Sequence, residues 1–252
     1  WLDLDFRIRL PRDITDTPNT TRQQLSMLRA WPLAAPKTPD GYYHRASSTN
    51  PYYVAKEGGR RNNMKDAFNS TLAFTIKPLK DLRLNGDITF NSFDSKYTRN
   101  SKVLYFYMPN GNISGSPSDA NISYVQKNYS MNKYYSANFY ANYEKTFGEH
   151  YLSGLAGYQV EYNDFASLVG YRDDLISQEL LSLSTATGEN TQATDNAYIW
   201  STMGYFARLN YNFREKYLLE FNARYDGSSR FPADLRWGFF PSASAGYNIA
   251  KE

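Results

Sequence analysis

The side chains best suited to bind a ligand lie in one short loop, residues 227–238, near the end of the chain. There the indole of Trp237 could stack on the face of a sugar ring, and the planar guanidinium of Arg230 could hydrogen-bond to hydroxyl groups. Arg230 and Trp237 are therefore the candidate substrate-binding residues. The alternative is that both only brace the loop, by packing of Trp237 under Phe231 and by pairing of Arg230 with Asp226 or Asp234.

Two other charged groupings have both a structural and a binding interpretation. Asp226, Arg230 and Arg236 could close the same loop as a polar network, or they could contact a ligand. The pair Asp173–Asp174 could supply calcium ligands, or it could belong to a solvated loop. In both cases the structural interpretation is the simpler one.

Residues for catalysis or metal binding are scarce. The chain has no cysteine and only two histidines, His44 in an expected loop and His150 in an expected tight turn, without metal-ligand spacing. Ser228–Ser229 stand in a Gly-Ser turn without a histidine nearby in sequence, whereas a nucleophilic serine needs a base. The sequence predicts no enzyme, no catalytic residue, no cofactor and no metal site.

Composition narrows the class of protein. The 252 residues are 41% hydrophobic and 17% aromatic, with 23 tyrosines, yet no apolar run approaches the roughly 20 residues that a membrane-spanning helix needs. The net charge of +3 is distributed along the chain, so nucleic acid is not expected as a partner. The tyrosine excess suits the aromatic belts of a transmembrane β-barrel, in which only every second residue meets lipid.

A two-residue alternation of side-chain type is the dominant pattern of the chain, and it is clearest over residues 217–226. Tyr217, Leu219, Phe221, Ala223 and Tyr225 alternate with polar residues. Successive side chains of a β-strand point to opposite faces, so this period indicates a strand with one apolar and one polar face.

The same pattern predicts about eight long strands, at residues 2–10, 66–77, 82–91, 131–146, 151–165, 198–213, 217–226 and 239–249. Three connections are tight turns, at residues 78–81, 148–150 and 214–215. The others are long polar loops, at residues 11–65, 96–130, 166–197 and 227–238. The motif F-x-E-[HK]-Y-L occurs at two of the turns, at residues 147–152 and 213–218. The fold class is therefore all-β, an antiparallel transmembrane β-barrel segment with short periplasmic turns and long extracellular loops.

This register makes two predictions about the sheet. Phe221, Tyr225, Leu209, Phe139 and Leu84 should point to lipid, and the opposite face should carry Arg224, Asn210, Asn138 and Asp87 into the lumen. Each strand should pair with its sequence neighbour, without bonding between the first strand and the last. The chain begins at Trp1 without a methionine and stops at Ala250-Lys251-Glu252, which favours an internal piece of a longer polypeptide.

A longer motif carries a family resemblance. Residues 224–232, RYDGSSRFP, and 236–247, RWGFFPSASAGY, resemble a segment of the SusC/RagA class of TonB-dependent outer-membrane transporters. Arg29-Ala-Trp-Pro32, Asn50-Pro51 and Glu57-Gly-Gly-Arg60 resemble the upstream barrel region of that family, in the right order. Tyr247 stands where the family often has Trp. The resemblance spans nearly the whole chain.

The resemblance implies that residues 1–252 are part of the β-barrel domain of a TonB-dependent receptor, without its plug domain or its C-terminal strands. It also implies a cell outer membrane location, import of glycan or peptide oligomers energised by TonB, and a SusD-like lipoprotein partner. Substrate identity does not follow from it. Two other classes stay open: an autonomous small outer-membrane barrel acting as an adhesin or anchor, and a soluble all-β carbohydrate-binding module.

Overall fold

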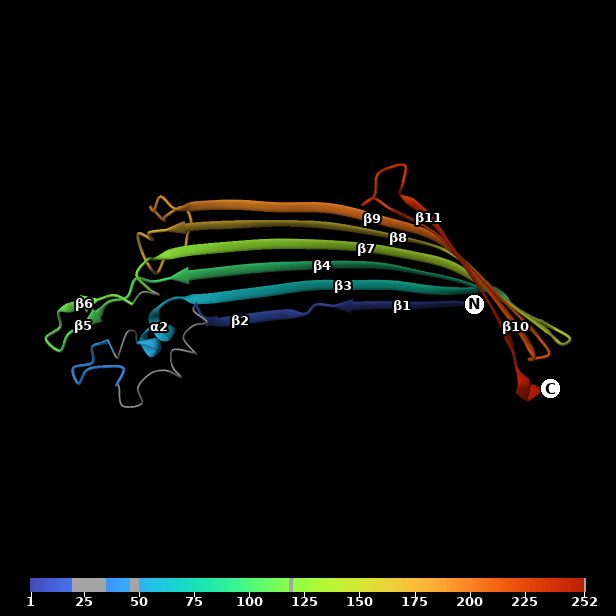
Figure 1. Cartoon of the computed structure of the whole chain (residues 1–252), viewed down its shortest axis with the longest axis horizontal. Helices are drawn as coiled ribbons and strands as arrows, with labels where there is room; N and C mark the ends of the chain where they lie inside the picture. Colours follow the sequence, from blue (N-terminus) through green and yellow to red (C-terminus); the bar gives the residue numbers. More distant parts are fainter. Residues whose placement is uncertain (20–34, 46–49, 118–119, 252) are drawn as a thin grey trace.

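The computed structural model describes residues 1–19, 35–45, 50–117 and 120–251, and it is dominated by one curved antiparallel sheet (Figure 1). The strand order is β1-β3-β4-β7-β8-β9-β10-β11, and β2 also pairs with β3. The strands are β1 (Leu2–Arg9), β2 (Arg12–Pro18), β3 (Arg60–Leu79), β4 (Leu82–Ser101), β7 (Tyr124–Phe147), β8 (His150–Asp173), β9 (Thr191–Phe213), β10 (Tyr217–Ser228) and β11 (Trp237–Tyr247). The predicted all-β, antiparallel fold is confirmed.

The sheet is open in the described part of the chain. The strands of the sheet follow one another in chain order, with β1 and β2 both pairing with β3, and the path runs from β1 at one edge to β11 at the other without a pairing between the two. This confirms the predicted topology. An eight-stranded barrel closed on itself, which the anchor hypothesis needs, is therefore not what these residues form.

Most strands are longer than the sequence pattern predicts. β7 and β8 have 24 residues each, and the connections between strands are shorter than expected. The extensions lie at the loop-side ends, for example in β9 over residues 191–197, where polar side chains occupy both faces. A strand that projects into water on both sides loses its two-residue hydropathy pattern, so the pattern located only the part with one apolar face.

The predicted loop over residues 11–65 is wrong at its start, because β2 continues β1. Leu2 opposes Ile76 and Arg12 opposes Asp66 in one unbroken register along β3. Pro11 interrupts the ladder since it has no N–H to donate, although its carbonyl still accepts from Ala67 N at 3.0 Å. An edge strand tolerates such a break, so proline here marks a gap in one strand rather than its end.

The three tight turns occur where the sequence places them, at the end of the sheet opposite the long loops (Figure 1). Arg214 and Glu215 both adopt left-handed backbone conformations, with φ of 57° and 54°, as a two-residue hairpin turn of primed type requires. The two F-x-E-[HK]-Y-L corners are neighbours in space, because Arg214 forms an ion pair with Glu149 and its N–H bonds the Glu149 carbonyl at 2.8 Å.

A small lobe with its own apolar core stands at the loop side. It combines the helix α2 (Pro51–Glu57) with the two-stranded sheet of β5 (Phe106–Tyr107) and β6 (Ile113–Gly115). Tyr53, Val54, Leu104, Phe106 and Ala120 are buried together, and Tyr53 stacks on Tyr43 with ring centroids 3.8 Å apart. A second small core, Val125, Leu175 and Ala186, lies under the loop between β8 and β9. A final 3₁₀ turn, η1 (Ile249–Lys251), follows β11.

The residues of α2 explain two of the sequence fragments that resemble the family. Asn50 caps the helix by accepting a hydrogen bond from Tyr53 N at 3.0 Å, and Pro51 occupies the first turn, where its missing N–H costs nothing. Gly59, with φ of 113°, turns the chain into β3 against the Asn100 carbonyl, where a Cβ atom would clash. Arg29-Ala-Trp-Pro32 lies outside the described residues.

One face of the sheet carries an apolar band between two rows of aromatic side chains. The row nearer the loops runs through ring contacts of Phe68, Phe90, Tyr135 and Tyr162, and continues through Tyr158, Tyr205, Tyr225 and Trp237. The row nearer the turns runs through Phe147, His150, Phe213, Tyr217 and Tyr247. Aromatic girdles that flank an apolar band are typical of transmembrane barrels.

Charged side chains on this face lie mostly outside the apolar band. Beyond the loop-side aromatic row the face becomes charged, with Asp66 paired to Arg12, with Asp94 opposite Asp66 on β4, and with Lys96 two residues beyond Asp94. Lys145 is a charged residue inside the band, two residues from Phe147 of the turn-side row. Its long, flexible side chain can extend past that row and place the ammonium group in water. A strand of 24 residues has far more residues than the ~9–11 that cross lipid, and it measures roughly 80 Å. Most of its loop-side length therefore lies outside the apolar band. None of the helices in the described part is both long and apolar enough to span a membrane.

Candidate substrate-contacting surface

The polar face of the sheet is the candidate functional surface, and the strand register defines it. Directly opposed residues of antiparallel strands share a face. Leu84 opposes Ala141, which opposes Ala156, and the series continues across the sheet. It places all five residues predicted to face lipid on the apolar side, namely Leu84, Phe139, Leu209, Phe221 and Tyr225. Asp87, Asn138, Asn210 and Arg224 share the other face, so the predicted register is confirmed.

Hydrogen bonds between neighbouring strands hold the side chains of the polar face in place. Asn138 Nδ2 donates to Asp87 at 2.9 Å, and Arg208 Nε donates to Asn222 at 2.6 Å. Glu161 accepts from Gln159 Nε2 at 2.8 Å and from Thr202 Oγ1 at 3.3 Å, which leaves one carboxylate shared by β8 and β9. Such paired but water-accessible groups can exchange partners with a polar solute without leaving a buried charge unpaired.

A cavity of about 460 Å³ opens on this face where β10 ends and β11 begins, beside the middle of β8 and β9. Its volume lies in the range of small-ligand sites. A fork of two hydrogen bonds, each 3.0 Å, joins Arg224 to Asp226 in its wall. The wall combines charged, hydroxyl and aromatic groups, among them Glu161, Thr202, Arg224, Asp226, Arg236 and Phe240.

Arg230 reaches the polar face from the loop between β10 and β11. Its guanidinium carbon lies 4.9 Å from the ring centroid of Trp200, a residue of β9 that shares the polar face with Arg224. Trp200 in turn contacts Tyr134 on β7, with ring centroids 6.4 Å apart. Arg230 forms no ion pair with either Asp226 or Asp234 among the described residues; Asp226 binds Arg224 instead. The geometry therefore places Arg230 in an aromatic and cationic patch that a planar or hydroxylated solute could contact.

Trp237 lies differently from the loop position that the sequence suggests. It is the first residue of β11 and opposes Gly227 on the apolar face. Its ring stacks on Tyr225 at 4.8 Å and contacts Tyr205 at 6.4 Å, which makes it part of the loop-side aromatic row. It also borders the cavity described above. Contact with a substrate stays a prediction for both Arg230 and Trp237.

The other singled-out residues of this loop have structural contacts. Arg236 Nε donates to the Phe231 carbonyl at 3.2 Å, and Ser229 Oγ accepts from Ser201 N at 2.8 Å. Ser228 Oγ accepts from the Arg230 N–H at 3.3 Å. The expected Asp226, Arg230 and Arg236 network is thus replaced by three separate contacts, with Arg224, Trp200 and the Phe231 carbonyl.

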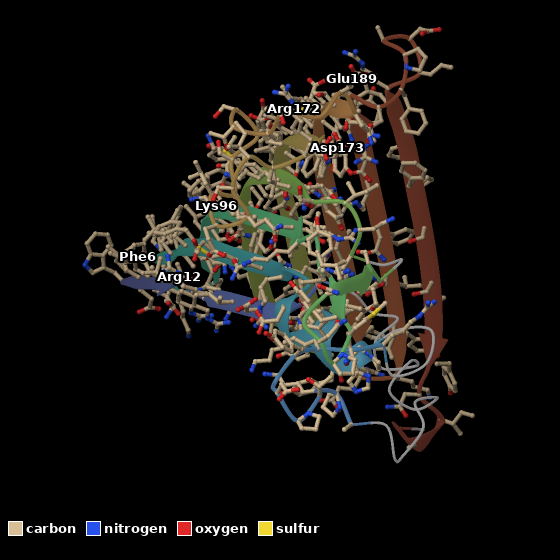
Figure 2. The ribbon with its side chains drawn as sticks, turned by 90° about the vertical axis from the view of Figure 1, so that its left-hand side faces the viewer. Phe6, Arg12, Lys96, Arg172, Asp173 and Glu189 are labelled. Atoms are coloured by element: carbon tan, nitrogen blue, oxygen red, sulfur yellow. The ribbon has the colours of Figure 1, made fainter. Side chains whose placement is uncertain are left out.

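Asp173 and Asp174 close the loop between β8 and β9 through their backbone. The Asp173 carbonyl accepts from Gly188 N at 3.0 Å, and the Asp174 carbonyl accepts from Thr187 N at 2.8 Å. Figure 2 shows Arg172 and Asp173 near Glu189 at this loop-side end of the sheet, away from Phe6 and Arg12 at the β1–β2 edge. No grouping of three metal-ligating side chains occurs in the described ranges. His150 contacts Tyr211, with 2.7 Å between Nδ1 and the hydroxyl oxygen, in the turn-side aromatic row.

The pKa values of two titratable groups on the loop side are shifted by their surroundings. Burial raises the pKa of the Tyr53 phenol in the loop-side lobe. The hydrogen bond from Lys102, 2.8 Å long, lowers the pKa of the Glu179 carboxyl and links the loop after β4 to the loop after β8.

The strand pattern alone does not single out Trp200 and Glu161. Both lie on the polar face, where the strand pattern treats every side chain as equivalent. A tryptophan on the polar face of an amphipathic strand departs from that pattern, and this departure was the available signal.

This chain is similar to one family of known proteins. The family model described as "TonB dependent receptor-like, beta-barrel" matches residues 6–252. "TonB-dependent receptor SusC" of Bacteroides thetaiotaomicron is 35% identical over 120 residues, which cover 46% of this chain and 11% of that protein. "TonB-dependent receptor P39" of Formosa agariphila is 28% identical over 196 residues, which cover 73% of this chain and 16% of that protein.

Among solved structures, the fold is similar to the "RagAB peptide transporter". The TM-score is 0.72 at 17% identity, with 98% of this chain and 28% of that chain covered. The chain therefore spans between about a tenth and a third of the length of the relatives it matches. Since the family match extends over nearly every residue, the chain belongs to the β-barrel family of TonB-dependent receptors.

Proposed function

We propose that this chain is part of the barrel wall of an outer-membrane transporter that imports glycan or peptide oligomers. The observation that carries the proposal is the two-faced sheet: an apolar band between aromatic rows on one side, and hydrogen-bonded polar side chains with a cavity on the other. A sheet that faces lipid on one side and an aqueous lumen on the other is suited to pass polar solutes.

Three further parts of the proposal rest on family membership. Residues 1–252 belong to the barrel domain of a longer polypeptide in the cell outer membrane. TonB supplies the energy, and a SusD-like lipoprotein is the partner outside the cell. Support comes from the relatives' names, since one is the "TonB-dependent receptor SusC" and another is the "RagAB peptide transporter".

The direct test is deletion of the complete gene in its host, followed by growth on a panel of oligosaccharides and a panel of oligopeptides. We expect growth on at least one oligomer to fail and to return with a wild-type copy. Growth must also fail when TonB is deleted. Two results together would contradict the transport proposal and favour a soluble binding module: normal growth of the deletion strain on both panels, and recovery of the protein from the soluble fraction of the wild-type strain.

Within this proposal, Arg230 and Trp237 are the residues to substitute first. We expect Arg230→Ala to lower uptake while surface abundance and heat-modifiable gel mobility stay normal, because its guanidinium lies on the polar face. Trp237→Ala removes a ring that stacks on Tyr225, so it should lower abundance and uptake together, and Trp237→Phe should restore both. Loss of abundance in Arg230→Ala would show that this residue only braces the loop.

A further inference from the structure

A pair of arginines on the polar face has no carboxylate partner. Arg61 on β3 and Arg99 on β4 oppose each other directly, near the loop-side ends of both strands. Like charges in this arrangement destabilise a sheet. Neither guanidinium forms an ion pair within the described part of the chain.

The neighbouring arginines on the other face are arranged differently. Across β2 and β3, Arg12 pairs with Asp66 and Arg60 pairs with Asp16. The same stretch of sheet therefore supplies a carboxylate to each arginine on the outer face and none to Arg61 and Arg99. The contrast is between two faces of the same strands, so it does not come from a general shortage of acidic residues.

A neutral residue holds the two guanidinium groups instead. Arg99 Nε donates to the side-chain oxygen of Asn19, and an Arg61 amino group donates to the Asn19 carbonyl at 3.0 Å. Asn19 is only 4% exposed. The Nε atom of Arg61 is buried without a hydrogen-bond partner among the described residues. An amide and a carbonyl orient the guanidinium groups but leave their positive charge uncompensated.

An aromatic wall completes the site. The ring centroid of Tyr124 lies 5.5 Å from the Arg99 guanidinium carbon, and Tyr124 also contacts Tyr171. The Tyr124 hydroxyl accepts from Asn19 Nδ2 at 3.0 Å. These contacts fix Arg99 in one orientation, which reduces the conformational entropy that it loses when it binds an anion.

Carboxylates on the same face stand further away. Asp13 opposes Lys65, four residues along β3 from Arg61. Asp173 opposes Tyr124 from β8, two strands away from Arg99 or roughly 10 Å across the sheet. In sequence, residues 20–34, which follow Asn19, contain no aspartate or glutamate.

We propose that Arg61 and Arg99 form a binding site for a carboxylate group on the imported oligomer. A carboxylate matches the planar fork of a guanidinium with two parallel hydrogen bonds, and two adjacent forks favour it over a neutral group. The inference rests on the proposed function for its location in the lumen and specifies it further: the substrates include acidic glycans or acidic peptides. Both sources supply the same carboxylate chemistry.

The test uses the purified full-length transporter and two matched probe pairs. One pair is tetragalacturonate and its methyl ester, and the other is a hexapeptide with one Glu and its Gln counterpart. Titration calorimetry gives the ratio of affinities within each pair. We expect the wild type to prefer the carboxylate member of at least one pair by about tenfold, the contribution of one charge-assisted hydrogen bond. The pair that shows the preference identifies the source as glycan or peptide.

Variants separate a local site from a general positive field. Arg61→Gln with Arg99→Gln should abolish the preference, and Arg99→Lys, which keeps the charge but loses the fork, should reduce it. Lys127→Gln removes one charge at the same height on the opposite face and should leave the preference unchanged. Wild-type heat-modifiable gel mobility is the control that each variant is folded. If the double variant does not fold, the result for Arg99→Lys decides the test.

Two results would overturn the inference: no preference for either carboxylate probe in the wild type, or equal loss of preference in Lys127→Gln. The growth test of the proposed function is independent of both. A transporter that imports oligomers without any preference would contradict only the carboxylate site. A preference in the purified protein, together with normal growth of the deletion strain, would contradict only the import proposal.

Discussion

Arg230 and Trp237 show what sequence can and cannot predict about single residues. Trp237 borders the cavity, and Arg230 lies over the Trp200 ring on the polar face. The sequence pattern treats residues 227–238 as loop, whereas Trp237 already belongs to β11. A residue assigned to a loop is given no face of the sheet, so a strand boundary misplaced by two residues hid the face on which Trp237 lies.

Gly59 is the residue whose replacement should be felt most sharply. Its φ of 113° disfavours any other residue, and a Cβ atom would lie 2.2 Å from the Asn100 carbonyl oxygen, which is backbone and cannot rotate away. We expect Gly59→Ala to reduce the local free energy of unfolding by about 2–4 kcal/mol. Hydrogen exchange of residues 50–60 and 100–104 in the full-length protein measures this.

Gly41→Ala is the matched control for this prediction. Gly41 also has positive φ, 89°, but open space around the position of a Cβ atom. The Gly41→Ala variant should therefore lose only the part of the free energy of unfolding that comes from backbone strain, without a contribution from a steric clash. Equal protection in both variants would show that the close approach of Gly59 to Asn100 has no energetic consequence.

At the scale of elements, the band between the aromatic rows was predictable and the projecting ends were not. The part of each strand with one apolar face gave a clear two-residue period, for example over residues 217–226. Beyond the loop-side aromatic row, polar side chains occur on both faces, and β7 gains seven residues before Met131 that no periodicity marks. Proline misled the prediction at Pro11 because a missing N–H interrupts an edge strand without ending it.

The loop-side lobe should open at alkaline pH through Tyr53. Burial raises the pKa of this phenol in the folded lobe. A group whose pKa is raised on folding stabilises the fold below its unfolded pKa, about 10, and this contribution is lost as the pH rises above that value. Limited proteolysis of residues 35–59 should therefore accelerate above about pH 10.

Tyr53→Phe isolates this contribution. The ring stack on Tyr43 is kept, while the titrating hydroxyl is removed together with its hydrogen bond to the backbone of Tyr105. The variant should be somewhat less stable at neutral pH but should lose less stability between pH 9 and pH 11. The same acceleration in both proteins would assign the alkaline opening to other groups.

At the scale of the whole molecule, the sheet has one apolar and one polar face, which suits a position between lipid and an aqueous lumen. The register assigns opposite faces to adjacent residues, so neighbours such as Leu209 and Asn210 should meet different solvents. The sequence could predict these faces because alternation needs only local information. It could not predict the pairing of Arg61 with Arg99, which depends on how β3 and β4 align over the 37 residues between them.

Cysteine labelling tests the membrane assignment directly. The chain has no cysteine, so single substitutions give unique sites within it, and any cysteines elsewhere in the full-length protein are replaced first. In intact outer membranes, a water-soluble maleimide should label Asn210→Cys and Asn138→Cys from the lumen. It should not label Leu209→Cys or Phe139→Cys, because thiols surrounded by lipid stay protonated and out of reach.

The pattern of labelling, rather than its extent, separates the hypotheses. A membrane barrel gives alternation between neighbours on both β7 and β9, and detergent that solubilises the membrane should raise labelling at Leu209→Cys and Phe139→Cys. A soluble β-protein that buries its apolar face in a core would also protect those two positions, but detergent below its unfolding concentration would not expose them. Equal labelling of Leu209→Cys and Asn210→Cys in intact membranes would contradict the lipid-facing assignment itself, because charge and water could then reach both sides of the sheet.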